Sequence, residues 1–367
     1  MQMTQVLTHC VPVNHRGNWL FVELKTDAGL SGVGEASHSR NDEATSQLLR
    51  DTRPWLVGRD PCAIEELRLV IRKAVPTPTE VVSAIEQALW DLAGKAAGNP
   101  IYRLLGAHEL KPVPLYANIN RATVDRTPPG FAANAVAAAS EGFRAIKLAP
   151  FDEVRRDQED SALKVEHAAM GIARVREVCD AVRPHAEVYV DCHQRFDFGA
   201  ALEVARALHD LGVTWFEQPL DETVPEQLVR LCELSPIPLA GGENLRSLHT
   251  ARALIAHRPY PIFMPDVKRI GGILEMKEAA DVAAKHGMTT APHCPSGPIS
   301  VAASAHSMLA MEDCRVLEFP WGEIPWRKEL IRPAEQVLNG NLILSDRPGL
   351  GAELNRELVE RLVDGGA

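Results

Sequence analysis

The sequence is poor in the features that mark secreted, membrane-spanning and metal-thiolate proteins. It has seven cysteines in 367 residues, an odd number with no Cys-x-x-Cys pair, which excludes a disulfide framework and a thiolate zinc site. No apolar run approaches the roughly 18 residues that a membrane-spanning helix needs. The first residues, MQMTQVLTHCVPV, lack the apolar core of a signal peptide. These absences predict a protein of the reducing cytoplasm without a membrane partner.

Positive charge is also in deficit. The formal net charge is −10 and the sequence pI is about 5.7, which disfavours a nucleic-acid partner. An anionic small molecule is not excluded, because a bound metal or a lysine can reverse the field inside a pocket. With 46% hydrophobic and 24% charged residues, the composition is that of an ordinary globular protein.

Residues 1–112 are predicted to form a small α+β capping domain. The segment 18–37 contains alternating apolar residues and an Asp-Ala-Gly sequence at 27–29, which indicates a β-hairpin. The segment 78–98 carries apolar residues at spacings of three and four and ends at Gly98. This pattern predicts a helix that buries one face.

From about residue 113 the pattern changes to short apolar runs that alternate with helical segments. Eight such runs over 113–330 predict a parallel sheet, and eight βα units are typical of a (β/α)8 TIM-type barrel. The polar insertion 150–164 is interpreted as an extended loop. The tail, 331–367, is predicted to pack back on the cap. The runs are VPLYANIN at 113, AIKLAPF at 145, VYVDCH at 188, TWFEQPL at 214, PLAGGEN at 238, PIFMPDV at 261, MTTAPHC at 288 and RVLEFPW at 315.

Charged residues gather near the C-terminal ends of these runs. In a barrel these ends meet on one face, where enzymes of this fold have their active sites. Asp191, Glu217 and Glu243 follow one another at intervals of 26 residues, and three carboxylates in one space need a cation to offset their repulsion. An all-oxygen set suits Mg²⁺, with Mn²⁺ as the alternative, rather than zinc. The other charged residues near these ends are Lys147, His193, Asp266, Lys268, His293 and Glu318.

Four motifs, TWFEQPL, LAGGENLRS, MPDVKRIGG and APHCPSGPIS, resemble those of the enolase superfamily, specifically its mandelate racemase-like subgroup. The segment AIEQALWDLAGKAAGNPIYRLLGA is similar to a capping-domain helix of the same relatives, and the resemblance covers nearly the whole chain. It implies a cap over the mouth of the barrel and Mg²⁺ held by Asp191, Glu217 and Glu243. It also implies abstraction of a proton α to a carboxylate as the first step.

The resemblance assigns roles to further residues. Lys147 matches the first lysine of a Lys-x-Lys pattern, but Ala149 stands at the second, so one of the two bases of a racemase is missing. His293 with Asp266 matches the His–Asp dyad of the subgroup, in which the aspartate fixes the imidazole tautomer and the histidine is the general base. Glu318 matches the acid on the eighth strand that hydrogen-bonds the substrate carboxylate.

The Asp-x-His sequence at 191–193 is similar to one found in several sugar-acid dehydratases of the subgroup. There the histidine, here His193, resembles a general acid that protonates the departing β-hydroxyl. Arg195 is a candidate for binding a hydroxyl or distal carboxylate of a polar substrate. Lys268 is interpreted either as an alternative acid or base or as a partner of Asp266. The candidates for specificity in the loops that flank the predicted hairpin are Arg16, His38 and Arg40.

These residues predict a Mg²⁺-dependent dehydratase of an aldonic or aldaric sugar acid. His293 would remove the α-proton, and His193 would protonate the leaving hydroxyl. One alternative is a racemase, epimerase or cycloisomerase that uses the same enediolate with Lys268 as a second base. The other is a non-catalytic protein that binds a metal or a sugar acid. A small-molecule acid is the expected partner, and the relatives imply a homo-oligomer.

Overall fold

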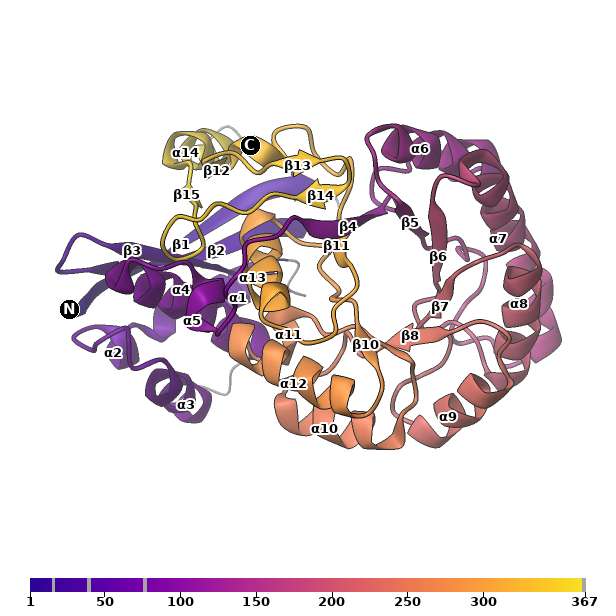
Figure 1. The fold of residues 1–367 in the computed structure, drawn as a ribbon, viewed down its shortest axis with the longest axis horizontal. Helices are drawn as coiled ribbons and strands as arrows, with labels where there is room; N and C mark the ends of the chain where they lie inside the picture. Colours follow the sequence, from indigo (N-terminus) through magenta and orange to yellow (C-terminus); the bar gives the residue numbers. More distant parts are fainter. Residues whose placement is uncertain (15–16, 38–40, 75–77, 365–367) are drawn as a thin grey trace.

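The computed structural model describes residues 1–14, 17–37, 41–74 and 78–364. The chain forms an α+β cap beside a (β/α)8 barrel, and the C-terminal segment lies against both (Figure 1). The fold class predicted from the sequence is therefore confirmed. Within these described ranges, no helix is both long and apolar enough to cross a lipid bilayer.

The cap is a three-stranded antiparallel sheet with helices on one side. The strands pair in the order β1-β2-β3, and a turn at 27–29 joins the last two, as the hairpin prediction required. The strands are β1 (Met3–Asn14), β2 (Gly17–Thr26) and β3 (Ser31–Glu35). The helices are α1 (Asp42–Asp51), α2 (Arg53–Leu56), α3 (Ile64–Ala74), α4 (Thr79–Ala97) and α5 (Ile101–Leu104).

Helix α4 lies close to the predicted limits and packs directly on the sheet. It ends at Gly98, whose φ of 64° is in the left-handed region that glycine adopts without strain. Gly32 and Gly34 of β3 allow the close approach, because Cβ atoms there would lie 2.2 Å and 1.8 Å from carbonyl oxygens of α4. The sheet and α4 therefore enclose a common apolar core.

Eight parallel strands form the barrel, as the eight apolar runs predict. Strands β4 to β10 pair in chain order, and β11 pairs with β4 (Figure 1). The strands are β4 (Val113–Asn118), β5 (Ala145–Leu148), β6 (Glu187–Asp191), β7 (Trp215–Glu217), β8 (Leu239–Gly241), β9 (Ile262–Phe263), β10 (Thr289–Thr290) and β11 (Leu317–Phe319). The helices are α6 (Pro128–Ser140), α7 (Ser161–Val182), α8 (Phe198–Asp210), α9 (Pro225–Leu234), α10 (Leu248–His257), α11 (Val267–Ile270), α12 (Ile273–Lys285) and α13 (Pro298–Leu309).

The inside of the barrel is filled with side chains. Tyr116, Tyr189 and Trp215 pack against one another, and the ring centroids of Tyr189 and Trp215 are 3.5 Å apart. Lys147 Nζ lies 5.1 Å from the centroid of the Tyr116 ring, so the ammonium group borders this aromatic cluster. The barrel axis is therefore closed to a ligand, and the strand ends are the part of this fold where a ligand would bind.

The insertion after β5 is shorter than the sequence suggests. The predicted loop covers 150–164, but α7 begins at Ser161. Asp160 caps this helix by accepting hydrogen bonds from the backbone N–H groups of Ala162, at 2.8 Å, and Leu163, at 3.3 Å. The loop prediction is wrong for its last four residues, because an N-cap aspartate makes this polar stretch a helix start.

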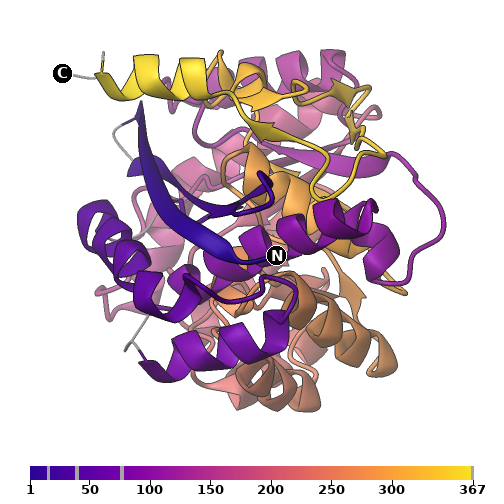
Figure 2. The same cartoon turned by 90° about the vertical axis from the view of Figure 1, so that its left-hand side faces the viewer.

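The C-terminal segment contacts both domains. β14 (Asn341–Leu342) pairs antiparallel with β4 of the barrel. Arg356, the first residue of α14 (Arg356–Asp364), forms an ion pair with Glu23 of the cap strand β2. Figure 2 shows α14 running beside the cap sheet. The remaining elements are a 3-10 helix (Arg327–Glu329), β12 (Ile331–Arg332), β13 (Val337–Leu338) and β15 (Glu353–Leu354).

Two buried carboxylates of the cap hold the N-termini of two barrel helices. Glu86 of α4 accepts the first two backbone N–H groups of α12 at 2.7 Å and 3.0 Å. Glu35 of β3 accepts the N–H groups of Gly297, at 2.6 Å, and Ser300, at 2.8 Å, at the start of α13. Negative charge is stabilising at a helix N-terminus. The cap is thus fixed to the two helices that follow β9 and β10.

His306 in α13 is expected to make the protein less stable in mild acid. Its Nδ1 accepts the N–H of Tyr102 at 3.3 Å and its Nε2 lies 3.2 Å from the carbonyl oxygen of Leu350, an arrangement that fits the neutral imidazole. Burial lowers the pKa of His306 to about 4. The unfolded chain takes up this proton below about pH 6.5, so the free energy of unfolding falls between there and about pH 4, by up to roughly 3 kcal/mol.

Denaturant unfolding at about pH 7 and about pH 5 checks this expectation, with His306→Gln as the comparison. The variant cannot titrate and should lose less stability than the parent. Burial also raises the pKa of Glu86 to about 7. Its protonation increases the free energy of unfolding as the pH falls, and this contribution is the same in the parent and in the variant. An equal loss of stability in the two proteins would contradict the assignment.

Candidate active site

Three carboxylates meet at the ends of three neighbouring strands. Asp191 ends β6, Glu217 ends β7, and the two residues are register partners in the parallel sheet. Glu243 follows β8 by two residues, and all three side chains are buried. Burial raises the pKa of Glu217 well above its usual value, and the neighbouring carboxylates add to this effect in spite of Lys147. Such a concentration of buried negative charge needs compensation by cations.

The donor set suits a divalent cation. No three of the described His, Cys, Asp and Glu side chains are arranged as a ready-made metal cage. One oxygen, Glu243 Oε2, is buried without a hydrogen bond, although His293 Nε2 lies 2.9 Å away. Three buried carboxylates offer only oxygen donors, and such a set fits a hard ion better than a soft one. Besides His293, the cationic or protonatable side chains against the triad include Lys147, 2.8 Å from Glu217, His193, 2.9 Å from Asp191, and Arg269, 2.8 Å from Glu243.

Lys147 connects the triad to the eighth strand. Its Nζ lies 2.8 Å and 3.1 Å from the two carboxylate oxygens of Glu217 and 3.0 Å from Glu318 Oε1. Burial alone would lower the pKa of Lys147, but the charges of Glu217 and Glu318 outweigh it and raise the pKa. Asn118 at the end of β4 also donates to Glu318 Oε1, at 2.5 Å. The positive charge of Lys147 is thus held beside the carboxylates of the triad.

His293 and Asp266 form the predicted pair. His293 Nδ1 lies 2.8 Å from Asp266 Oδ2, and both side chains are buried. On the other side of the ring, Nε2 faces Glu243 Oε2 at 2.9 Å and Glu318 Oε2 at 3.7 Å. Burial would lower the pKa of His293, but the carboxylates of Glu243, Glu318 and Asp266 raise it to about 10. The ring is therefore oriented by Asp266 with Nε2 directed to the site.

His193 flanks the opposite end of the triad. Its side chain is 41% exposed, and Nε2 lies 2.9 Å from Asp191 Oδ2. The backbone of His193 and of Gln194 has φ values of 50° and 58°, a left-handed bend at the end of β6. Arg156 from the insertion donates to the His193 carbonyl at 2.8 Å. The negative charge of Asp191 raises the pKa of His193, so the exposed imidazole favours the form that can give up a proton.

The other predicted site residues have different surroundings. Arg195 donates to the carbonyl of Val154 at 2.6 Å, which anchors the insertion, so its contact with a substrate stays a prediction. Lys268 is buried, and its Nζ donates to the carbonyl of Ser37 in the cap at 3.2 Å. The specificity candidates Arg16, His38 and Arg40 lie outside the described residues.

Sequence reasoning missed three polar groups at the site. Asn118 is a polar side chain at the end of the first apolar run, and this position was the available signal. Arg269 follows Lys268 directly in the motif MPDVKRIGG and pairs with Glu243. Arg156 lies within the polar insertion, where nothing in the local pattern distinguishes it from other charged residues.

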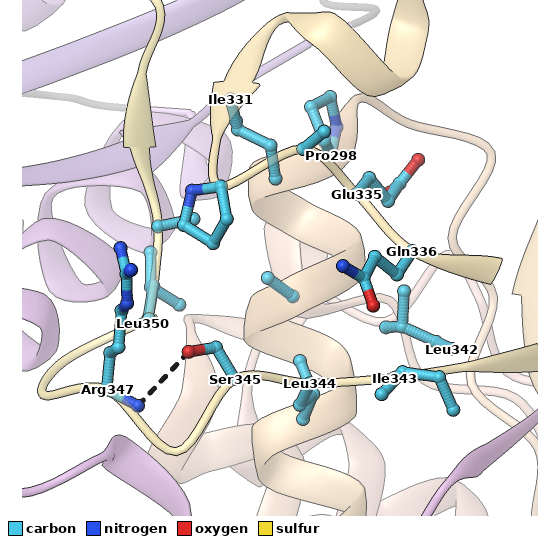
Figure 3. A pocket seen from close by; sticks show the side chains of 15 residues that line it. Pro298, Ile331, Glu335, Gln336, Leu342, Ile343, Leu344, Ser345, Arg347 and Leu350 are labelled. Carbon is cyan, nitrogen blue, oxygen red and sulfur yellow. Dashed lines mark hydrogen bonds between the residues drawn. The ribbon is translucent and has the colours of Figure 1, made fainter.

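A separate hollow of about 300 Å³ lies between α13 and the C-terminal segment (Figure 3). Its walls are mainly apolar, with Leu342, Leu344 and Leu350 among the lining residues, and Arg347 at its edge. None of the predicted site residues that the structure describes lines it. The hollow is therefore distinct from the carboxylate cluster, which lies at the ends of β6, β7 and β8.

Acids at the ends of three successive barrel strands, next to an α+β cap, are the arrangement of an enolase-type enzyme. Comparison with known proteins agrees: the chain matches the model "Enolase C-terminal domain-like" over residues 130–358. It matches "Mandelate racemase / muconate lactonizing enzyme, N-terminal domain" over residues 4–106. The chain belongs to the mandelate racemase/muconate lactonizing enzyme family of the enolase superfamily, which confirms the resemblance seen in its motifs.

The curated relatives include sugar-acid dehydratases. D-xylonate dehydratase of Haloferax volcanii is 29% identical over 382 residues, which cover 99% of this chain and 90% of that protein. D-galactonate dehydratase of Verminephrobacter eiseniae is 30% identical over 370 residues, 98% of this chain and 94% of that one. D-galactarolactone cycloisomerase of Agrobacterium fabrum is 30% identical over 359 residues, 93% of this chain and 90% of that one.

A solved structure confirms the fold over the whole length. A mandelate racemase/muconate lactonizing enzyme-like protein from Rubrobacter xylanophilus superposes with a TM-score of 0.90 at 30% identity. The match covers 98% of this chain and 97% of the other. With family, fold and relatives in agreement, the chain is an enzyme of this superfamily.

Proposed function

We propose that the protein is a Mg²⁺-dependent dehydratase of an aldonic or aldaric sugar acid. The observation that carries the proposal is the position of two imidazoles on opposite flanks of the carboxylate triad. His193 lies against Asp191, and His293 lies against Glu243. Loss of water from a hydroxy acid needs one base and one acid, and these two groups supply them. The names of the dehydratase relatives support the same reaction class.

His293 removes the proton α to the substrate carboxylate. Asp266 orients the imidazole through Nδ1 and stabilises the imidazolium. Nε2, which lies 2.9 Å from Glu243 in this structure, is the nitrogen that would take the α-proton when a cation engages Glu243. The product of this step is an enediolate with additional negative charge on the carboxyl group. Lys147 is placed to stabilise this charge. Glu318, whose Oε1 lies 3.0 Å from Lys147 Nζ, is the residue that would orient the substrate carboxyl group. Bound to Asp191, Glu217 and Glu243, Mg²⁺ would supply Lewis-acid stabilisation of the same charge.

His193 completes the elimination. As the enediolate collapses, the bond between the β-carbon and its hydroxyl breaks, and the proton of His193 converts the leaving hydroxide to water. The remaining enol takes up a proton at C3 and becomes a 2-keto-3-deoxy acid. His193 suits this role because its side chain is partly exposed while the triad is buried.

A cycloisomerase is the second candidate, because one relative carries the name D-galactarolactone cycloisomerase at 30% identity. It would use the same abstraction by His293 but would release no water. A non-catalytic binding protein is disfavoured by two contacts at the site. Lys147 Nζ lies 2.8 Å from Glu217, and His293 Nδ1 lies 2.8 Å from Asp266. In a protein that had lost its activity, substitutions would be expected to have broken some of these contacts.

The experiment that tests the proposal is a screen of aldonic and aldaric acids with the pure enzyme and Mg²⁺. Formation of a 2-keto acid, followed as the semicarbazone, is the expected result for at least one substrate. EDTA should abolish it, and added Mg²⁺ should restore it. Release of the α-proton to solvent without any 2-keto acid would instead assign the enzyme to the isomerases.

His193→Asn is expected to separate the two halves of the reaction. Dehydration should fall by roughly 10²- to 10⁴-fold, the usual contribution of a general acid. Exchange of the α-proton with D₂O should continue, because His293 and Asp266 are unchanged. Both are measured by NMR on one sample, with Gln194→Asn, a variant of the next residue in the same bend, as the control. If exchange also disappears, His193 is not the acid of a second step.

A further inference from the structure

We infer that Lys268 is a positioning residue that ties the cap to the Asp266–His293 pair, rather than a second acid or base. This inference rests on the proposed function only in taking His293 as the group that removes the α-proton. It does not require that water is lost. Lys268 lies in the short helix α11, two residues after Asp266, the aspartate that caps this helix and orients the imidazole.

Lys268 contacts Asp266 through both its backbone and its side chain. Its N–H donates to Asp266 Oδ1 at 2.8 Å, and its Nζ lies 3.8 Å from Asp266 Oδ2. Oδ2 is also the atom that lies 2.8 Å from His293 Nδ1. The lysine and the imidazole therefore share one carboxylate oxygen. Asp266 is only 1% exposed, so its negative charge needs compensation by nearby cations, and Lys268 and His293 supply it together with Arg269, whose Nε lies 4.0 Å from Oδ2.

The ammonium group reaches from the barrel into the cap. Its Nζ donates to the carbonyl of Ser37 at 3.2 Å, across 231 residues of sequence. Ser37 is itself fixed, because its hydroxyl accepts the N–H of Leu20 at 3.2 Å. Since the side chain of Lys268 is only 4% exposed, this bond is shielded from competing water.

The cap segment that contains Ser37 also contacts the chain that follows His293, the other member of the Asp266–His293 pair. Glu35, two residues before Ser37, accepts the N–H groups of Gly297 and Ser300 at the start of α13, the helix that follows His293. A Cβ atom at Gly297 would lie 2.9 Å from the Glu35 carboxylate, so the contact is close. Asp266 is thus tied to this stretch through Lys268, and His293 is tied to it through α13. The cap sets the distance between the two members of the pair.

A second base would need a different placement. It has to direct a free lone pair to the substrate α-carbon on the face opposite His293. The contacts of Lys268 Nζ are a carbonyl oxygen of the cap and a carboxylate oxygen of Asp266, both acceptors. In this position the side chain acts as a hydrogen-bond donor and as a compensating charge. Of the two interpretations open from the sequence, the partner of Asp266 is the one that this geometry favours.

The test compares Lys268→Met and Lys268→Arg with a matched control, Lys164→Met. Lys164 is also a buried lysine, with Nζ 3.8 Å from an aspartate oxygen, that of Asp197, but it contacts no member of the pair. Lys268→Met should lower kcat for water loss and for α-proton exchange by the same factor, roughly ten- to hundredfold. KM should change less than about threefold. Lys268→Arg should recover most of the activity, and Lys164→Met should keep it.

A double-variant cycle with Asp266→Asn separates positioning from a general effect on folding. If Lys268 acts through Asp266, then Lys268→Met should add less than about threefold to the loss already caused by Asp266→Asn. Full multiplication of the two losses would overturn the inference. So would α-proton exchange that persists in Lys268→Met while inversion of the α-carbon is lost, since that is the behaviour of a second base.

The outcome is independent of the proposed dehydration. A parent enzyme that exchanges the α-proton but forms no 2-keto acid refutes the dehydratase, and the ratio of exchange rates between variant and parent still tests Lys268. Thermal unfolding of each variant shows whether it is folded. If Lys268→Met does not fold, Lys268→Arg and Lys268→Gln carry the same comparison, with the larger loss expected for the neutral side chain.

Discussion

Replacing His293 with asparagine is expected to remove α-proton abstraction almost completely. A positioned general base contributes roughly 10²- to 10⁴-fold to a rate, and we expect the upper part of this range because no other imidazole contacts Glu243 and Asp266 among the described residues. Asparagine retains a polar group of similar length but has no group that accepts a proton near neutral pH. Both water loss and exchange with D₂O should fall together, which distinguishes this variant from His193→Asn.

The measurement is single-turnover exchange of the α-proton by NMR, with product formation followed in parallel. His286→Asn is the matched control. His286 lies at the other end of strand β10, where its Nδ1 contacts the carbonyl of Val282 at 2.9 Å. The control should exchange at the parental rate. If His293→Asn keeps exchange within about tenfold of the parent, the base is another group, and the role of Asp266 as its orienting partner fails with it.

Replacing Asp191 with asparagine should remove both Mg²⁺ binding and activity. Losing a partner in the outer shell of a metal site costs roughly 10- to 100-fold in affinity, and a direct ligand should cost at least the upper value. The reason is electrostatic, because the amide keeps one oxygen but loses the charge that balances a hard dication. Titration calorimetry with MgCl₂ gives the affinity, and the semicarbazone assay gives the activity.

Two controls make this second prediction specific. Glu187 is at the opposite end of the same strand, β6, where it pairs with Arg315 at 2.7 Å, so Glu187→Gln should bind Mg²⁺ as the parent does. His193 contacts Asp191 from outside the predicted ligand set, so His193→Asn should weaken Mg²⁺ binding less than Asp191→Asn does and should still bind the ion at saturating MgCl₂. If Asp191→Asn binds Mg²⁺ with parental affinity, this carboxylate is not a ligand and the metal lies elsewhere.

The agreement between sequence and structure at the strand ends has a simple physical origin. A parallel barrel strand is short, apolar and followed by a loop, so a charged residue just after it is conspicuous. Asp191, Glu217 and Glu243 were visible in this way, and the fold then brings any such residues to one face. The pairing of His293 with Asp266 was likewise predictable, through the resemblance of their motifs, and the 2.8 Å contact agrees with it.

Other features depend on contacts that no local pattern encodes. The cap carboxylates Glu35 and Glu86 accept hydrogen bonds from backbone N–H groups 262 and 187 residues away. The N-terminus of a helix stabilises any carboxylate near it, so the helix sequence does not indicate which acid will bind there. The guanidinium of Arg195 donates to the carbonyl of Val154 in the insertion, a contact that the sequence pattern did not indicate, while its predicted contact with a substrate stays a prediction. Periodicity places a residue on a strand or helix, whereas the direction of a long side chain is set by whichever partner packing brings near.

The sequence by itself determined the barrel and the cap, because these follow from short-range patterns repeated along the chain. It also placed three carboxylates at successive strand ends, whereas the roles of the two histidines came from the resemblance of their motifs and stay predictions. Only the tertiary structure decided how Lys268 is used, since its carbonyl partner, Ser37, belongs to a different domain. Only the tertiary structure also placed the imidazoles at the two ends of the triad. The distance between groups on different strands is a property of the closed barrel and the docked cap, which side-chain packing fixes.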